Sequence, residues 1–234
     1  MKKIILLCLL TTGFVQATDG VFAINDVCAV FGCFPGDTAG YPVTITNAGS
    51  YQLTGTIVSA STTDDVIQIN ANNVTLDLNG FSIIGPRACS GFNDTLVCSE
   101  GAMTADGITT NAVERFNLVV KNGIVKGFDL GVNLRGRNLS VNHVTAEENS
   151  FGITLNGTGL ISDCITNRNS SVGISGALST ILISNSMAMG NRSGPVFSAG
   201  AVCSNVLFNL NGNSTNFCAK YTNGSICEGL VACP

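Results

Sequence analysis

Residues 131–141 read GVNLRGRNLSV, residues 152–162 read GITLNGTGLIS and residues 173–183 read GISGALSTILI. In each stretch a glycine begins an alternation of apolar and polar residues, and the three glycines recur with a period of about 21 residues. Gly107 begins a similar stretch slightly more than one period before Gly131. Self-similarity at a fixed period of about 20 to 50 residues is the signature of a solenoid, and short β-branched strands favour a β repeat over a helical one.

A second apolar segment follows each glycine by about ten residues. These segments begin at Leu118, Leu139, Leu160 and Ile181, which are again one period apart. Each segment is followed by Asn, Asp or Gly, residues that tolerate the left-handed backbone of a tight corner. We therefore expect an all-β chain that forms a right-handed parallel β-helix, with roughly eight coils of about 22 residues each.

The composition is compatible with stacked coils and excludes several other classes. The chain has 11 basic and 15 acidic side chains among 234 residues, against 27 glycines and 25 asparagines. Coiled coils and disordered chains need far more charge than this. A formal net charge of −4 also argues against a nucleic-acid partner. Stacked corners, in contrast, favour asparagine ladders and disfavour columns of like charge.

Residues 1–17 have the pattern of a secretory signal peptide. Lys2 and Lys3 precede the apolar run Ile4–Leu10, and small residues precede a cut after Ala17. The run is shorter than the roughly 20 residues that a transmembrane helix needs. We therefore predict a secreted or periplasmic protein without a transmembrane segment.

The period also predicts how the rest of the chain is divided. Residues 87–105 interrupt the repeat, and such an insert is expected to form a loop on one face. A solenoid also needs capped ends, because its terminal strand edges are unpaired. We expect an N-terminal cap at 18–42, repeats at 43–214 and a cysteine-rich C-terminal cap at 203–234.

Export makes disulfides the expected state of the nine cysteines that follow the signal peptide. Sequence proximity suggests the pairs Cys28–Cys33 and Cys89–Cys98. Cys164 is left over, and its apolar neighbours predict a buried small hydrophobe rather than a reactive thiol. The other four would pair among themselves, in a connectivity that the sequence leaves open: Cys203, Cys218, Cys227 and Cys233.

Four further stretches carry a resemblance to a known family: YPVTI at 41–45, GSYQLTG at 49–55, VIQINANNVTLDLNGFSI at 66–83 and VKNGIVKGF at 120–128. They resemble secreted right-handed parallel β-helix repeat proteins of the pectin-lyase-like superfamily. The resemblance covers residues 43 to about 214. It implies the fold but no single activity, because this fold hosts lyases, hydrolases, epimerases, tailspikes and adhesins.

The period also predicts which charged side chains meet between coils. Lys126, Glu147 and Arg168 are one period apart and should form a column of alternating sign. Glu114 and Arg135 are also one period apart. Exposed ion pairs of this kind contribute a few tenths of a kcal/mol each.

Asp65, Asp106 and Asp129 each begin the same strand of the repeat, next to the insert. Stacked carboxylates repel one another unless a proton or a cation intervenes, and Ca²⁺ prefers such oxygen ligands. β-helix lyases of the resembled family use carboxylate-bound calcium to acidify a uronic-acid proton. The competing interpretation is that each Asp caps its corner through its own backbone.

Three side chains are candidates for catalysis. Arg135 and Arg137 could bind an anionic sugar or serve as a base, although Glu114 is expected to neutralise one of them. His143 lies near Asp163 in the stack and is a conceivable general base.

The motifs of the enzymes in the resembled family are mostly missing. We therefore predict a secreted, non-catalytic module that binds a polysaccharide, a cell-surface glycan or another surface. The alternative is a calcium-dependent polysaccharide lyase that acts on a uronic-acid polymer.

Overall fold

The structure is a computed structural model of the chain. The predicted signal peptide at 1–17 and most of the predicted C-terminal cap lie outside the residues that it describes. The described residues are 20–92, 95–99, 103–176, 180–197, 201–209, 211, 218, 220–222 and 226–227.

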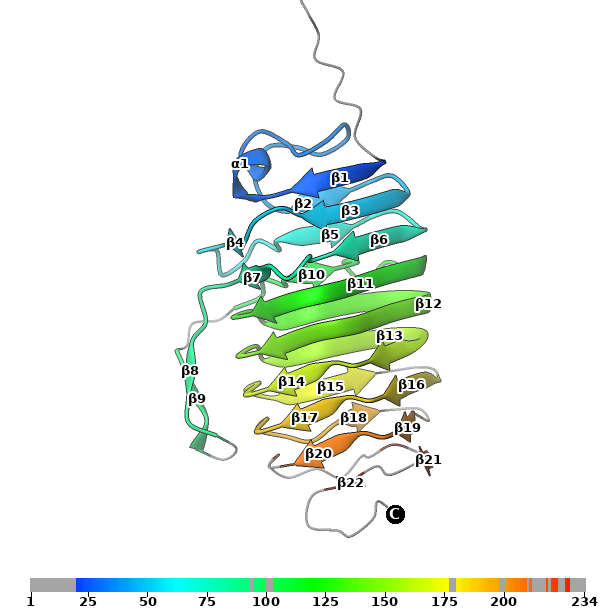
Figure 1. Cartoon of the computed structure of the whole chain (residues 1–234). Coiled ribbons are helices and arrows are strands. Elements are labelled where there is room, and N and C mark those ends of the chain that lie inside the picture. The colour runs from blue at the N-terminus through cyan, green and yellow to red at the C-terminus, as the bar shows by residue number, and fades with distance from the viewer. Residues whose placement is uncertain are drawn as a thin grey trace, which may run out of the picture.

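The chain forms a parallel β-solenoid with three faces, stacked as Figure 1 shows. Face A contains β2 (Val43–Ile45), β5 (Ile67–Ile69), β10 (Ile108–Thr109), the first parts of β12 (Leu130–Glu147) and β13 (Phe151–Ser162), β15 (Val172–Gly176) and β18 (Val196–Phe197). Face B contains β1 (Val21–Ile24), β3 (Gly49–Leu53), β6 (Val74–Asp77), the first part of β11 (Arg115–Lys126), the middle of β12, the end of β13, β16 (Ile181–Ser184), β19 (Val202–Ser204) and β21 (Lys220–Thr222). Face C contains β4 (Ile57–Val58), β7 (Ser82–Ile84), the ends of β11 and β12, β14 (Ile165–Asn167), β17 (Met187–Met189), β20 (Leu207–Asn209) and β22 (Ile226–Cys227).

The prediction of an all-β parallel solenoid is confirmed, with about seven turns instead of eight. Between Val43 and Asn209 the chain passes through faces A, B and C in that order seven times. The difference has a simple cause, because the described middle part of the 87–105 insert forms a separate two-stranded sheet outside the stack and does not contribute a turn. In the described part of both predicted caps, β1, β21 and β22 extend the faces by further strands.

The core is a set of columns of inward side chains, one from each turn. On face B the central column contains Leu76, Val120, Val141, Ile161 and Ile183, all fully buried. Burying an aliphatic side chain of this size contributes about 1.5–3 kcal/mol. The alternation of apolar and polar residues in the sequence therefore sets which side chains point inward.

One column of the repeat is displaced by a residue relative to the sequence prediction. Gly157 stacks on Gly136, but Gly159 rather than Leu160 stacks on Leu139. Counted from Val43, turn 4 is β12 and turn 5 begins with β13. Turn 4 has two residues between Gly136 and Leu139, whereas turn 5 has only Thr158 between Gly157 and Gly159. Leu160 therefore points outward, next to Ser140, and a constant period does not describe this turn.

Left-handed asparagines form the corner between faces A and B. Asn73, Asn117 and Asn138 have φ angles of 56°, 58° and 54°. The Nδ2 of Asn117 donates to the Oδ1 of Asn73 at 2.6 Å, and the Nδ2 of Asn138 donates to the Oδ1 of Asn117 at 2.8 Å. All three side chains are exposed, and together they form the exposed ladder.

A second ladder lies inside the solenoid, next to the corner between faces C and A. It consists of Asn149, Asn169, Asn191 and Asn211, of which the first three have no exposed surface. The Oδ1 of Asn169 accepts from the N–H of Asn149 at 3.0 Å, and its Nδ2 donates to the carbonyl of Ala146 at 3.0 Å. This buried ladder supplies hydrogen-bond partners to backbone groups at and just after the ends of face C strands, such as the carbonyl of Ala146 and the N–H of Asn149.

The repeated glycines of the sequence make room for the buried ladder. A Cβ on Gly131 would lie 2.7 Å from the Nδ2 of Asn149, and a Cβ on Gly152 would lie 2.9 Å from the Nδ2 of Asn169. Both distances are below a normal van der Waals contact. The glycine period and the buried ladder are therefore two sides of one packing arrangement.

Disulfides tie down the two ends and the insert. The structure joins Cys28 to Cys33, Cys89 to Cys98 and Cys203 to Cys218. The first two pairs are those that proximity suggested. The side chain of Cys227 and the whole of Cys233 lie outside the described residues. Cys164 is free and buried, and burial raises the pKa of its thiol to about 12.

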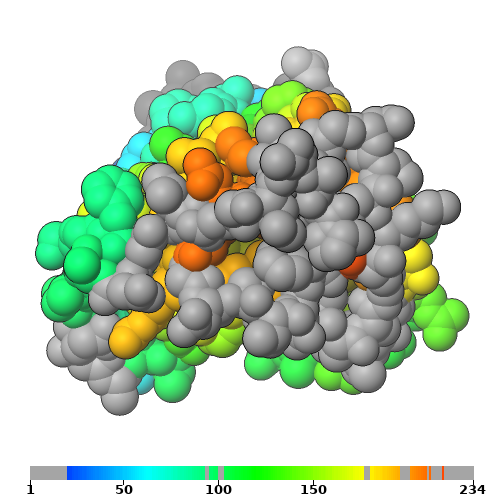
Figure 2. Space-filling view, turned by 90° about the horizontal axis from the view of Figure 1, so that it is seen from below, coloured from blue at the N-terminus to red at the C-terminus, as the bar shows by residue number. Residues whose placement is uncertain are grey.

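The insert forms a strap along one side of the solenoid. Within residues 87–105, β8 (Cys89–Ser90) and β9 (Val97–Cys98) pair as an antiparallel hairpin across the disulfide. Figure 1 shows this hairpin running down the stack beside the later turns, and Figure 2 shows it on the same side from below.

Candidate functional site

A groove crosses turns 3 to 5 at the corner between faces A and B. Two hollows of about 370 and 510 Å³ adjoin each other here, and Arg137 and Thr158 line both of them. Ligand sites commonly have volumes of about 300–1,000 Å³. We call these adjoining hollows the arginine groove. The residues other than glycine that line it are Glu114, Arg135, Arg137, Asn138, Leu139, Ser140, Asn156, Thr158 and Leu160.

The groove is hollow because two stacked glycines lie at its centre. Gly136 and Gly157 have φ angles of 140° and 157°, a backbone conformation that side chains disfavour. A Cβ at either position would overlap the carbonyl of the turn before it, at Arg115 and at Gly136 respectively. The base of the groove is therefore the backbone of these two glycines, and the side chains of the flanking residues surround it.

The groove combines positive charge with hydrogen-bonding groups. Arg137 is exposed and Arg135 is half-buried, with the N–H of Arg135 donating to the Thr110 hydroxyl at 3.0 Å. The predicted ion pair between Glu114 and Arg135 is wrong, since it is not among the ion pairs of the described residues. Both arginines therefore have guanidinium donors available for a ligand.

His143 does not belong to this groove. It lies at the corner between faces B and C, with a φ of 53°, exposed and in register with Asp163. Asn122 and Asn185 occupy the same corner position in other turns, also with left-handed backbone. His143 thus takes the place of a corner asparagine, at the far edge of face B from the arginines.

The predicted column of three aspartates is a pair. The Oδ1 of Asp65 accepts from the N–H of Asp106 at 2.8 Å. The level below Asp106 is occupied by Leu130, whose N–H donates to Asp106 at 3.2 Å. Asp129 is one residue earlier, level with Ala105, and consecutive residues of a strand point to opposite sides.

The Asp106 carboxylate is a buried, hydrogen-bonded group. It is 6% exposed, and its Oδ2 accepts from the Nδ2 of Asn133 at 2.9 Å. Desolvation raises the pKa of Asp106 to about 6, partly offset by the hydrogen bond from Asn133, while the charge of Asp65 raises it further. Desolvation also raises the pKa of Asp65. The described residues contain no group of three His, Cys, Asp or Glu side chains placed to hold a metal ion.

The charged column at the corner between faces C and A is displaced in the same way. Lys126 and Glu147 lie 3.9 Å apart, as the period predicts. Arg168 pairs with Glu148 at 3.0 Å instead of Glu147, because Asn167 occupies the level below Glu147. The predicted alternating column is therefore correct for its first pair and wrong for its second.

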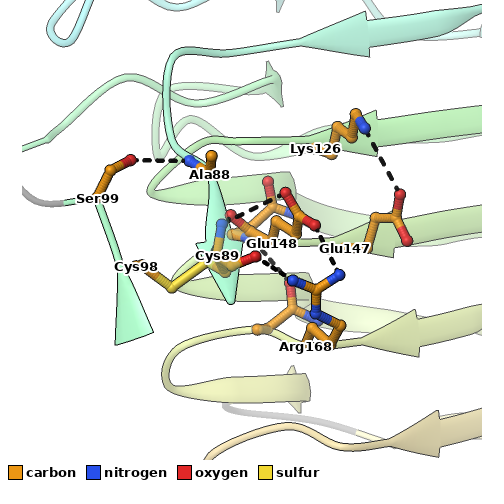
Figure 3. A network of polar contacts seen from close by, with 10 residues as sticks. Ala88, Cys89, Cys98, Ser99, Lys126, Glu147, Glu148 and Arg168 are labelled. Carbon is orange, nitrogen blue, oxygen red and sulfur yellow. Dashed lines mark hydrogen bonds and ion pairs between the residues drawn. A yellow bond between two sulfur atoms is a disulfide. The ribbon is translucent and has the colours of Figure 1, made fainter. Parts of the chain in front are cut away.

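Arg168 and Glu148 hold the strap against the solenoid, as Figure 3 shows. Glu148 accepts from the N–H of Cys89 at 3.5 Å, and Arg168 donates to the Cys89 carbonyl. Arg87, which the sequence did not single out, is 7% exposed and donates to the hydroxyls of Ser150 and Ser170 at 2.7 and 2.8 Å. Its position inside the insert was the only available signal.

Comparisons with known proteins show the fold. No protein-family model matches the sequence, and no curated protein matches it. The structure is similar to the crystal structure of Dettilon tailspike protein (gp208), with a TM-score of 0.50 and 13% sequence identity. The match covers 82% of this chain and 43% of that one, so the chain spans less than half the length of the tailspike protein.

The described residues include no helix long and apolar enough to cross a membrane.

Proposed function

We propose that this chain is a non-catalytic glycan-binding module and that the arginine groove is its binding site. The observation that carries the proposal is the pair of arginines on one turn, Arg135 and Arg137, beside a floor of bare backbone. Guanidinium groups bind carboxylates and sulfates through paired hydrogen bonds. Asn156 and Thr158 on the next turn add neutral partners for sugar hydroxyls.

The preferred ligand is a glycan that carries acidic groups. The chain as a whole has a formal charge of −4, so a groove with two arginines and one glutamate is a local positive site on an acidic protein. Acidic sugars would be drawn to the groove and repelled by much of the remaining surface. The tailspike protein with which the chain shares its fold supports a role at a surface.

The proposal includes an extracellular or periplasmic location and membership of the pectin-lyase-like superfamily. Disulfides persist in oxidising compartments, and the described residues contain three of them. The signal-peptide pattern of residues 1–17 supports the same location.

Calorimetric titration with a uronic-acid polymer, and with the same polymer esterified, tests the proposal. We expect binding of the acidic form, and Arg137→Ala should weaken it about tenfold, since a charged hydrogen bond contributes about 1.5–3 kcal/mol. Arg192→Ala is the matched control, because Arg192 is exposed but lies between β17 and β18, away from the groove. Asp65→Ala should leave binding unchanged.

Equal binding of the esterified polymer, or no effect of Arg137→Ala, would contradict the proposal. Calcium-dependent appearance of ultraviolet absorbance from unsaturated products would indicate a lyase in its place.

A further inference from the structure

The N-terminal end of the solenoid carries the two most exposed large apolar side chains of the described residues. Phe31 is 81% exposed and Val27 is 73% exposed, and Val30 between them is 59% exposed. The three lie on one side of α1 (Asp26–Ala29) and the turn that follows it, at positions i, i+3 and i+4. Val58, which is 59% exposed, approaches the same helix, since its N–H donates to the carboxylate of Asp26 at 3.3 Å. We call these four residues the N-terminal patch.

The cap does not need the N-terminal patch for its own packing. Its interior is filled by Phe22, Phe34 and Tyr51, whose ring centroids lie 5.0 to 5.6 Å apart. The Cys28–Cys33 disulfide closes the loop after α1. Large apolar side chains gathered on a rigid surface typically mark a site of interaction.

The same end of the molecule is acidic. Residues 20–86 contain five aspartates and no lysine, arginine or histidine. Asp77 pairs with Lys121 of the following turn at 3.3 Å, and the other four are not in any ion pair of the described residues. Asp26, next to Val27, accepts only uncharged donors, the Tyr41 hydroxyl at 2.7 Å and the Val58 N–H. The patch therefore lies beside Asp26, a carboxylate that no basic side chain neutralises, at an end of the molecule where most carboxylates have no basic partner.

We propose that the N-terminal patch docks an apolar segment of another protein that carries lysine or arginine. Apolar contact with Phe31 and Val27 would supply the affinity, and the carboxylates without a basic partner would select a basic segment. A second copy of this chain is disfavoured, because a symmetric contact through this end would bring two acidic surfaces together. The site is separate from the arginine groove, which lies on turns 3 to 5.

Fluorescence anisotropy with three labelled synthetic peptides tests this proposal. One peptide alternates lysine and leucine, a second alternates lysine and serine, and a third alternates glutamate and leucine. We expect only the first to bind, with an affinity that falls as salt is raised. The double variant Val27→Ser/Phe31→Ser should bind it about tenfold more weakly.

Phe92→Ser is the matched control, because Phe92 is 59% exposed but lies on the strap. Both variants should keep the melting temperature of the unmodified protein, since exposed substitutions rarely destabilise. Equal binding of all three peptides, or an unchanged affinity in the double variant, would overturn the proposal. So would a concentration-dependent dimer in sedimentation that Phe31→Ser abolishes, because the occupant would then be a second copy.

Discussion

The exposed ladder and the buried ladder place the same residue type, asparagine, in opposite environments. In the exposed ladder, Asn117 has a left-handed backbone, and its side-chain amide forms hydrogen bonds with the amides of other exposed asparagines. In the buried ladder, Asn169 has no exposed surface and bonds backbone groups of the turn before it. Asparagine is therefore used for its backbone conformation at one corner and for its hydrogen-bonding capacity at the other. The difference predicts very different costs of substitution.

Substitution of Asn169 is the most direct test of this difference between the buried and the exposed ladder. Asn169→Ala would leave the N–H of Asn149 and the carbonyl of Ala146 buried without their partners. Each unsatisfied buried group costs about 1–3 kcal/mol, so for these two groups we expect a loss of about 2–6 kcal/mol in the free energy of unfolding. Urea denaturation measures this, with Asn138→Ala from the exposed ladder as the control. Equal costs at the two positions would remove the distinction between the ladders.

Asp106 is a buried side chain that, unlike the buried asparagines, can carry a charge, so its contribution to stability depends on pH. The pKa of Asp106 is about 6 in the folded protein and 3.8 without burial, so the folded state binds more protons between these values. Stability from this group is fully present below pH 3.8 and is lost as pH rises through 6. Two pKa units correspond to about 3 kcal/mol.

Urea denaturation at pH 4 and pH 7.5, values on either side of about 6, measures this dependence. Asp106→Asn should reduce the loss of stability between the two values, relative to the unmodified protein. A loss that is the same in both proteins would show that Asp106 does not titrate in this range.

The glycines beside the buried ladder sharpen the comparison further. Gly152→Ala would place a Cβ 2.9 Å from the Asn169 amide and close to the carbonyl of Gly173. Overpacking of this kind costs about 1–3 kcal/mol. Gly55→Ala is the control, because the nearest atom to its added Cβ is 3.9 Å away. If the two variants melt at the same temperature, the ladder does not constrain these glycines.

The exposed ladder should give the smallest effect. Asn117→Ala keeps a left-handed backbone that costs about 1–2 kcal/mol for an ordinary residue, whereas Asn117→Gly removes that cost. We expect the alanine variant to lose about 1 kcal/mol and the glycine variant to unfold at nearly the same urea concentration as the unmodified protein. A glycine variant as unstable as the alanine variant would show that the side-chain bonds of Asn117, rather than its backbone, stabilise this corner.

The period located the elements of the candidate site but not their register. Arg135 and Arg137 could be selected from the sequence because an arginine side chain can bind an anionic sugar. The absence of an ion pair between Glu114 and Arg135 could not be predicted, since it depends on side-chain directions at a corner. The hydrogen bonds of the Arg87 guanidinium and of the Asn169 side-chain amide were also missed, because the groups that they bind belong to other turns.

Single-residue differences between turns explain the errors. Asp129 was placed below Asp106 because both aspartates precede the same strand of the repeat, and Arg168 was placed below Glu147 by counting a constant interval. In the structure Leu130 and Asn167 occupy those levels. Because side chains alternate from one residue to the next, a slip of one position moves a side chain to the other side of its strand.

The sequence by itself determined the parallel β-solenoid, the position of the strap, and the disulfides Cys28–Cys33 and Cys89–Cys98. These follow from local signals: alternating apolar residues, corner residues that tolerate left-handed backbone, and cysteines close together in the chain. Only the tertiary structure decided the arginine groove, the pair formed by Asp65 and Asp106, and the buried asparagine ladder. Each depends on which residues lie at the same level in successive turns. The level of each residue is fixed by the number of residues in every preceding corner and by the backbone hydrogen bonds between turns.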